Sequence, residues 1–270
     1  MTSKLGNLAF DRWIEGDGDG TVLNSAVNGE PVARITSAGL DFQAVLAHAR
    51  NVGGSNLRKL TFHERGEMLK SLAKHLMEHK DELYELSTDT GATRSDSWID
   101  IDGGISTLFV FSSKGRREMP NDHVYLDGQV EALSRNGTFV GQHICTPKLG
   151  AAIHINAFNF PCWGMLEKLA PALLAGVPAI VKPASSTAYL TELMVHRIQR
   201  SGILPDGALQ LICGGVGDLF DHLNCQDTIA FTGSKSTAEF LQQHPRVVGE
   251  SVAFTAETDS LNSSILGPDA

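Results

Sequence analysis

The sequence has few cysteines, few tyrosines and no long apolar run. Its four cysteines are Cys145, Cys162, Cys213 and Cys225. They stand far apart and form no C-x-x-C pair, which excludes a disulfide framework and a zinc ribbon and is typical of a reduced compartment. None of the three tyrosines lies in a Y-x-x-x-K pattern, which disfavours a catalytic tyrosine-lysine pair.

Membrane and secretion signals are absent from the sequence. Apolar residues nowhere run uninterrupted for about 18 positions, the length that a membrane helix needs. Residues 1–20 also lack the apolar core and the small-residue cleavage site of a secretory leader. We therefore expect a cytoplasmic protein with no membrane partner.

Basic residues are also scarce. Lysine and arginine total 22 against 31 aspartates and glutamates, which gives a formal net charge of -9. This balance argues against a nucleic-acid partner, because proteins that bind the phosphate backbone carry basic patches. Any anionic ligand must therefore be held by a few local groups.

Two patterns resemble metal sites but have simpler explanations. His75, Glu78 and His79 match the inverted zinc-protease pattern H-x-x-E-H, yet no third ligand follows. An amphipathic helix with a solvated face explains them. The acidic residues 15–20, EGDGDG, lack the ligand spacing and the distal glutamate of a calcium loop and predict a surface turn. We expect no metal site.

The first 115 residues have a mainly helical pattern. Between residues 60 and 91, one helical face carries Met68, Leu69, Leu72, Leu76 and Leu83. This spacing predicts one long helix or a broken pair. A second helix is predicted from about Ser95, with Gly115 as its stop. Residues 116–148 are polar and rich in turns, with short alternating pieces, which predicts a projecting hairpin arm.

Residues 149–270 alternate between apolar runs and helical stretches. The runs are AAIHIN, VPAIVK, LQLIC, TIAFTG and SVAFT. Strand-helix alternation of this kind predicts an α/β fold with a Rossmann-type parallel sheet covered on both faces. In such sheets ligands bind beyond the carboxyl ends of the strands. The residues that follow each run are therefore the candidates for a site.

Asn159 lies where the first run leads into a helix predicted at residues 162–175, with Gly176 as its stop. Pro161 fits the first turn, where a missing N–H does no harm. Asn159 is then either a helix cap or an amide donor to a developing oxyanion, and spacing does not separate the two. Cys162 lies on the apolar stripe of the helix and is predicted to be a buried structural thiol.

Three other strand ends carry polar or flexible residues. Lys182 either extends to solvent or holds ribose hydroxyls or a phosphate. Gly215 lies in a glycine-rich turn, but Phe220 stands where the third glycine of G-x-G-x-x-G would fall, so a tight turn is the default interpretation. Gly233 and Ser234 form a turn whose N–H groups and hydroxyl suit a pyrophosphate.

Taken together, the segments INAFNFPCW, KPASST, FTGS and FTAETDS resemble the aldehyde dehydrogenase superfamily in order and spacing. The segments LTFHERGEMLKSLAKHL and TGATRSDSWIDIDGGISTLF resemble one branch of it, the N-terminal aldehyde dehydrogenase halves of bifunctional phenylacetate-degradation enzymes. The resemblance covers essentially the whole chain. It implies a cofactor domain built from residues 1–115 and 149–270, with residues 116–148 as an oligomerisation arm.

The resemblance also implies a role for each matching position. Asn159 matches the oxyanion-hole asparagine, and Glu257 matches the general base that activates the deacylating water. Lys182 matches the lysine that binds the adenosine ribose. The implied cofactor contacts are Ile155, Asn156, Phe158, Lys182, Ser185, Gly215, Gly233 and Ser234.

The implied activity is NAD(P)-dependent oxidation of an aldehyde to the acid through a thiohemiacetal and a thioester. A CoA-linked semialdehyde of phenylacetate catabolism is the expected substrate, and the full-length protein is expected to be a homo-oligomer. Ser185 stands where NAD-preferring relatives often place a glutamate. Because a carboxylate would repel a 2′-phosphate and serine leaves room for it, NADP is favoured over NAD.

The sequence departs from the family pattern at its nucleophile. The family cysteine lies some tens of residues beyond the glutamate, in a second domain, and none of the four cysteines matches it. The usual glycine pair after Glu257 is also replaced, by Thr258 and Asp259. We therefore expect that the catalytic domain is missing from this chain and that the 270 residues alone are inactive. The alternative is a non-catalytic nucleotide-binding remnant or interaction module.

Overall fold

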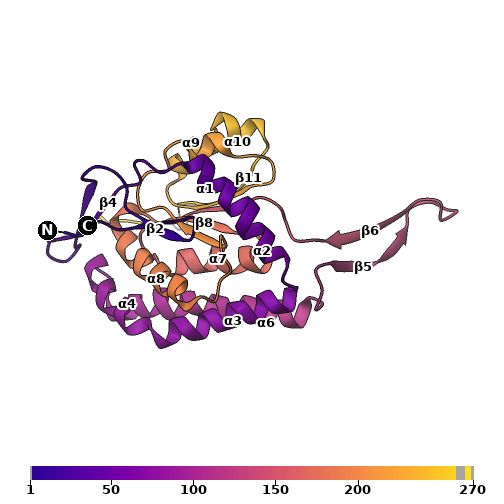
Figure 1. The fold of residues 1–270 in the computed structure, drawn as a ribbon, viewed down its shortest axis with the longest axis horizontal. Coiled ribbons are helices and arrows are strands. Elements are labelled where there is room, and N and C mark those ends of the chain that lie inside the picture. The colour runs from indigo at the N-terminus through magenta and orange to yellow at the C-terminus, as the bar shows by residue number, and fades with distance from the viewer. Residues whose placement is uncertain (1, 260–264, 269–270) are drawn as a thin grey trace.

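A seven-stranded sheet forms the centre of the structure, a computed structural model that describes residues 2–259 and 265–268 (Figure 1). The strand order is β11-β10-β7-β8-β9-β1-β2. The five strands predicted from the sequence are parallel neighbours, which confirms the Rossmann-type sheet. They are β7 (Ala152–Ile155), β8 (Ala179–Lys182), β9 (Leu209–Leu211), β10 (Thr228–Thr232) and β11 (Ala253–Glu257).

The strand order creates a topological switch point between β7 and β10. From β7 the chain moves outward to β8 and β9, and it then returns to the other side for β10 and β11. Because the connections leave β7 and β10 in opposite directions, the carboxyl ends of these two strands border an open crevice. In the register, Ile155 pairs with Phe231 on one side and Lys182 on the other. The residues that follow these positions therefore meet at one edge of the sheet.

Helices cover both faces of the sheet (Figure 1). On one face lie α7 (Trp163–Leu174) and α8 (Ala188–Ser201), with α3 (Phe62–Glu78), α4 (Lys80–Ser87) and α6 (Gly104–Glu118) packed behind them. On the other face lie α1 (Phe42–His48), α9 (Lys235–Gln242) and α10 (Pro245–Gly249). Alternate strand residues supply a separate apolar core to each face: Val181 faces α7 and α8, whereas Ile153 and Ile180 face α1.

The predicted helices before the sheet are present, with one difference at the end of the second. The pattern at residues 60–91 forms the broken pair α3 and α4, interrupted at His79. A capping box of Thr61 and Glu64 fixes the start of α3. Gly115 is not a helix stop, because α6 continues to Glu118. A Cβ at Gly115 would lie 2.5 Å from the Leu174 side chain, so this glycine permits close packing of α6 on α7 instead.

Short elements join these helices. The helix α2 (Gly54–Arg58) continues from α1 through the π-helical turn η1 (Ala49–Gly53), and α5 (Arg94–Trp98) leads into α6 through a second such turn, η3 (Ile99–Gly103). The 3-10 helices among the described residues are η2 (Thr88–Thr90), η4 (Ser185–Thr187) and η5 (Leu219–His222).

Residues 7–35 contain strands that the sequence pattern does not predict. The strands β1 (Asn7–Ala9) and β2 (Arg12–Ile14) extend the central sheet in antiparallel fashion, with Leu8 paired to Leu211. The strands β3 (Thr21–Asn24) and β4 (Pro31–Ile35) form a separate pair. The part before residue 115 is therefore helical only after Ile35. The acidic turn between β2 and β3 is largely exposed, as predicted.

A two-stranded ribbon projects from the body of the molecule, as the sequence predicts (Figure 1). It consists of β5 (Tyr125–Ala132) and β6 (Val140–Cys145), paired antiparallel. Its two strands expose large apolar side chains, namely Leu126, Val130, Val140 and Ile144. Within the described residues, no helix is both long enough and apolar enough to cross a bilayer.

Candidate functional site

A cavity of about 730 Å³ lies at the switch point. The loop after β7, the end of β8, the turn after β10 and the end of β11 all contribute to its wall. Eight of the ten predicted site residues line it: Asn156, Phe158, Asn159, Lys182, Ser185, Gly233, Ser234 and Glu257. The strand topology therefore gathers residues that are far apart in the sequence.

A second cavity of about 400 Å³ adjoins the first. The two share four lining residues, which are Ala157, Asn159, Thr232 and Glu257. The remainder of the second wall consists of Phe160, which precedes α7, of Trp163, Gly164 and Glu167 of α7, and of Ile99 of η3. Asn159 and Glu257 thus stand where the larger cavity meets a smaller, partly aromatic one.

Asn159 does not cap the helix that follows it. The first N–H groups of α7 are bound by Asp100 of η3, whose carboxylate accepts hydrogen bonds from the Cys162 N–H at 3.0 Å and the Trp163 N–H at 2.7 Å. Asn159 itself is exposed and lines both cavities. The capping interpretation of the sequence is therefore wrong, and no local sequence signal points to Asp100 as the cap.

Glu257 is the last residue of β11 and is held there by the neighbouring strand. The Thr232 hydroxyl donates a hydrogen bond of 3.3 Å to the Glu257 carboxylate, and the Gly233 N–H donates to the Glu257 carbonyl at 3.1 Å. The carboxylate is exposed on the cavity wall. A carboxylate in this place has room for a water molecule beside it.

Lys182 and Ser185 form the cationic and hydroxylic part of the larger cavity. The Lys182 ammonium donates to the Pro183 carbonyl at 3.0 Å, and burial lowers the pKa of this lysine. An ammonium has three N–H groups, so two remain for a ligand. Ser185 begins the short helix η4 and is exposed.

The turn after β10 is more constrained than the sequence suggests. The Ser234 side chain caps α9 by accepting a hydrogen bond from the Thr237 N–H, and its hydroxyl donates to the Thr237 side chain at 2.9 Å. Asp259 accepts from the Lys235 N–H at 3.2 Å. The polar groups of this turn are thus already engaged with neighbouring residues.

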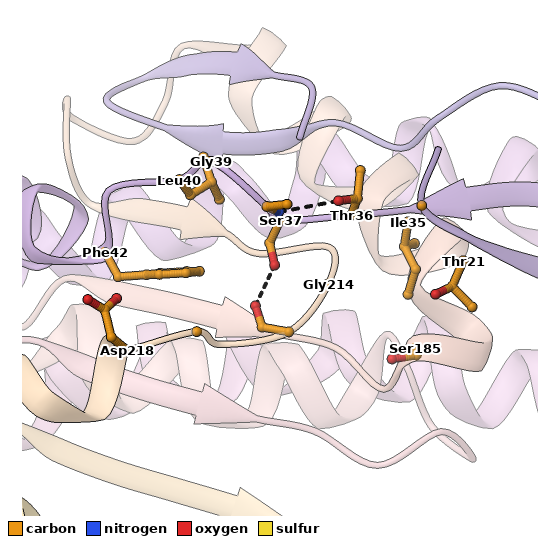
Figure 2. A pocket seen from close by; sticks show the side chains of 14 residues that line it. Thr21, Ile35, Thr36, Ser37, Gly39, Leu40, Phe42, Ser185, Gly214 and Asp218 are labelled. Atoms are coloured by element: carbon orange, nitrogen blue, oxygen red, sulfur yellow. Dashed lines mark hydrogen bonds between the residues drawn. The ribbon is translucent and has the colours of Figure 1, made fainter. Parts of the chain in front are cut away.

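Two predicted site residues lie outside the larger cavity. The Ile155 side chain packs against the apolar core on the α1 side of the sheet. Gly215 instead lines a third cavity of about 630 Å³, between the segment after β4 and the turn after β9. Figure 2 shows this cavity, with Ser37 directed toward the glycine turn and Ser185 at the opposite wall. The Ser37 hydroxyl donates to the Gly215 carbonyl at 2.5 Å, which ties the N-terminal segment to the sheet.

The cysteines and the histidine pair lie elsewhere. Cys162 is fully buried on α7, as predicted, and Cys213 is buried behind β9. Cys145 and Cys225 are exposed, but in the described part of the chain no cysteine lines either of the two adjoining cavities. The His75 imidazole contacts the Arg197 carbonyl at 3.1 Å, and His79 contacts the His75 carbonyl at 2.8 Å. Across residues 2–259 and 265–268, no cluster of metal-ligating side chains is found.

The fold and the site define an α/β domain of Rossmann type in which an amide, Asn159, and a carboxylate, Glu257, line the same two cavities at the switch point. The chain belongs to the aldehyde dehydrogenase family, whose model matches residues 13–270. Members of this family use NAD or NADP.

The chain is 44% identical over 268 residues to the 3,4-dehydroadipyl-CoA semialdehyde dehydrogenase of Aromatoleum evansii. The matched region covers 99% of this chain and 52% of that protein. An NADP-dependent enzyme of E. coli has a similar fold, with a TM-score of 0.80 and 23% identity, over 95% of this chain and 52% of that one. The NADP complex of a Bacillus halodurans glyceraldehyde-3-phosphate dehydrogenase superposes with a TM-score of 0.76 and 21% identity, over 94% and 52%. The chain thus spans about half the length of the relatives it matches.

Proposed function

We propose that this chain supplies the cofactor half and two reacting groups of an NAD(P)-dependent aldehyde dehydrogenase. The observation that carries the proposal is the shared lining of the two cavities. Asn159 and Glu257 belong to both, so a carbonyl held between them lies next to both the cofactor side and the aldehyde side. Family membership supports the same assignment.

In the proposed reaction a thiolate adds to the aldehyde carbon, and the Asn159 amide donates a hydrogen bond to the oxyanion that forms. One such donor, preorganised in a site that excludes water, is worth several kcal/mol of barrier. NAD(P), when bound, supplies the hydride acceptor. Glu257 then takes a proton from a water molecule, which attacks the thioester and releases the acid and the thiol. Thr232 orients the Glu257 carboxylate for this step.

The larger cavity fits a nicotinamide dinucleotide. The Lys182 ammonium has free donors beside the exposed Ser185 hydroxyl, which suits ribose hydroxyls and a phosphate. We propose NADP as the preferred cofactor, because Ser185 provides a hydroxyl where a carboxylate would repel the 2′-phosphate.

The proposed substrate is a semialdehyde linked to coenzyme A, of the kind met in phenylacetate and other aromatic catabolism. This assignment rests on the 44% identity to a dehydrogenase that is named for such a substrate. The smaller cavity has an apolar wall of Ile99, Phe160 and Trp163, which suits an acyl chain. The projecting ribbon, with its exposed apolar side chains, is proposed to pair with other subunits in a homo-oligomer. A cytoplasmic location stays a prediction.

We further propose that the thiolate comes from outside these 270 residues. The experiment is a turnover assay of the isolated chain with NADP and a test aldehyde, beside a cofactor titration of the same sample. We expect saturable NADP binding and no oxidation. Turnover that Asn159→Ala abolishes would contradict the external thiol, whereas failure to bind either NADP or NAD would overturn the proposed function itself.

A further inference from the structure

Asp100 is buried against the start of α7. Only 4% of its surface is exposed, and its carboxylate accepts from the Cys162 N–H at 3.0 and 3.3 Å and from the Trp163 N–H at 2.7 Å. Burial raises the pKa of Asp100 to about 6, and these N–H groups partly offset the effect of burial. A carboxylate at a helix N-terminus satisfies N–H groups that have no partner within the helix.

A second buried side chain holds the same segment from another helix. The Thr191 hydroxyl of α8 donates to the Pro161 carbonyl at 3.2 Å, and Thr191 is fully buried. Asp100 therefore fixes the N–H groups just after Pro161, and Thr191 fixes its carbonyl. Asn159 lies two residues before this doubly held point.

Close packing makes the Asp100 contact specific. A Cβ at Gly103 would lie 2.3 Å from the Trp163 ring, and one at Gly104 would lie 2.9 Å from the Trp163 backbone. The π-helical turn η3 therefore approaches α7 only because its last residue and the next are glycines. This approach brings the Asp100 carboxylate within hydrogen-bond distance of the helix.

In this arrangement, capping the helix and presenting an amide to the cavity fall to different residues. A helix usually receives its cap from a local side chain such as Asn or Ser. Here the local side chain, that of Cys162, makes no capping hydrogen bond, and a residue from another element takes the task. The Asn159 amide is thereby left for the cavity. We propose that Asp100 and Thr191 are positioning residues that hold Asn159 in its place on the cavity wall.

The inference rests on the proposed function for its kinetic consequence, but the placement of Asn159 is measurable without it. The variants are Asp100→Asn, which removes the negative charge and replaces one of the two acceptor oxygens at these N–H groups by a donor, and Thr191→Val, which removes one hydrogen bond at constant shape. The matched control is Asp96→Asn. Asp96 likewise accepts a backbone N–H at a helix start, as part of the capping box of α5, but it is exposed and lines neither cavity.

The first readout is NMR of the 270-residue chain labelled with ¹⁵N-asparagine. The Asn159→Ala spectrum assigns the Asn159 side-chain NH₂ signals. We expect these signals to shift or broaden in Asp100→Asn and, to a smaller extent, in Thr191→Val, and to stay unchanged in Asp96→Asn. Unchanged signals in a folded Asp100→Asn or Thr191→Val chain would overturn the proposal. If Asp100→Asn does not fold, Thr191→Val alone decides.

The second readout is steady-state turnover of the complete protein as its gene encodes it. We expect Asp100→Asn to lower kcat roughly 10-fold or more, as displaced catalytic groups do, with KM for NADP within about two-fold of wild type. The loss should disappear in the Asn159→Ala background, because both changes remove the same interaction. Independent, multiplying losses would show that Asp100 only stabilises the fold. If the wild-type protein oxidises no aldehyde, the proposed function is refuted. The NMR measurement then tests by itself whether Asp100 and Thr191 position Asn159.

Discussion

The Thr232 hydroxyl and the Glu257 carboxylate are joined by a hydrogen bond across the last register position of β10 and β11. Thr232 also lines both cavities. The hydrogen bond therefore connects the carboxylate to a strand that borders the switch point. Because β11 is at the edge of the sheet in the described structure, this contact is what keeps the Glu257 side chain over the crevice.

Removing the Thr232 hydroxyl should slow the hydrolytic half of the reaction. We expect Thr232→Val in the complete protein to lower kcat several-fold, since the carboxylate loses its orienting donor, without a change in the dissociation constant of NADP. Thr232→Ser keeps the hydroxyl and serves as the control. Stopped-flow measurement of the reduced cofactor checks this, because a slower hydrolysis leaves an initial burst intact. Equal losses in both variants would contradict the role of the hydroxyl.

A carboxylate at position 185 should change the cofactor preference. Ser185→Glu places a negative charge beside the proposed 2′-phosphate, and like charges a few ångströms apart in a partly buried site repel by roughly 1 to 4 kcal/mol. We expect NADP affinity to fall about 10-fold or more, with NAD affinity little changed. Ser186→Glu is the matched control, because Ser186 is exposed and lines none of the three cavities described. Fluorescence titration measures the dissociation constants of NADP and NAD for both variants. Equal losses of affinity for the two cofactors in Ser185→Glu would count against a 2′-phosphate at Ser185.

His154 should make the fold sensitive to acid. It is buried on β7, facing α7, and burial, with a smaller effect of the Lys168 charge, lowers its pKa to about 3. The unfolded chain takes up this proton near the ordinary pKa of about 6.5. The stabilisation from neutral His154 is therefore complete above pH 6.5 and is lost as pH falls toward 3, by about 1.4 kcal/mol per pH unit.

Urea unfolding between pH 4.5 and 8 tests this contribution. We expect His154→Leu to have a shallower acid loss, so that its stability relative to wild type improves steadily below pH 6.5. Asp100 acts in the opposite sense: its raised pKa of about 6 makes its contribution largest below about pH 4 and lost as pH rises through 6. That contribution is present in both proteins and cancels in the comparison. Parallel stability curves would show that His154 is not buried as a neutral group.

Asp227 should be a charged position at which substitution strongly destabilises the fold. It is fully buried and accepts hydrogen bonds from the Arg50 guanidinium at 3.0 Å and from the Ala151 and Asn224 N–H groups at 2.9 Å. Asp227→Ala leaves these donors unpaired, and we expect a loss of about 3 to 5 kcal/mol in unfolding free energy.

The control for Asp227 is Asp221→Ala. Asp221 is mostly exposed and has only a 3.5 Å pairing with His244, so we expect a change within about 0.5 kcal/mol. Chemical denaturation measures both variants. Because Asp227 precedes β10, at the end of the sheet opposite the site, NADP binding by the folded fraction should be unaffected. A loss below 1 kcal/mol for Asp227→Ala would contradict the buried pairing.

Much of the sheet and of the larger cavity was predictable from the sequence. The five parallel strands are apolar and bounded by helical patterns. The rule that ligands bind at strand ends points to the residues after each strand, among them Asn159 and Lys182, whereas Glu257 is assigned only through the family resemblance. The broken helix pair and the ribbon also follow from local periodicity. These features are predictable because each depends on residues that are close together in the chain.

The features that sequence reasoning missed depend on distant partners. The strands β1 and β2 have three residues each, too few for a periodic signal, and β1 is fixed by pairing with β9. Gly115 is a helix stop by local preference, but packing against Leu174 decides its role. The cap of α7 comes from Asp100, a residue that no local motif connects with Asn159.

The strand order also decides when the crevice forms during folding. The strands β7 and β10 are neighbours in the sheet, but β8, β9 and their helices separate them in the chain. Their pairing closes a long loop, and long loops close slowly because the lost chain entropy is repaid only by contacts made afterwards. In refolding, helical signal should therefore return first and nucleotide affinity last.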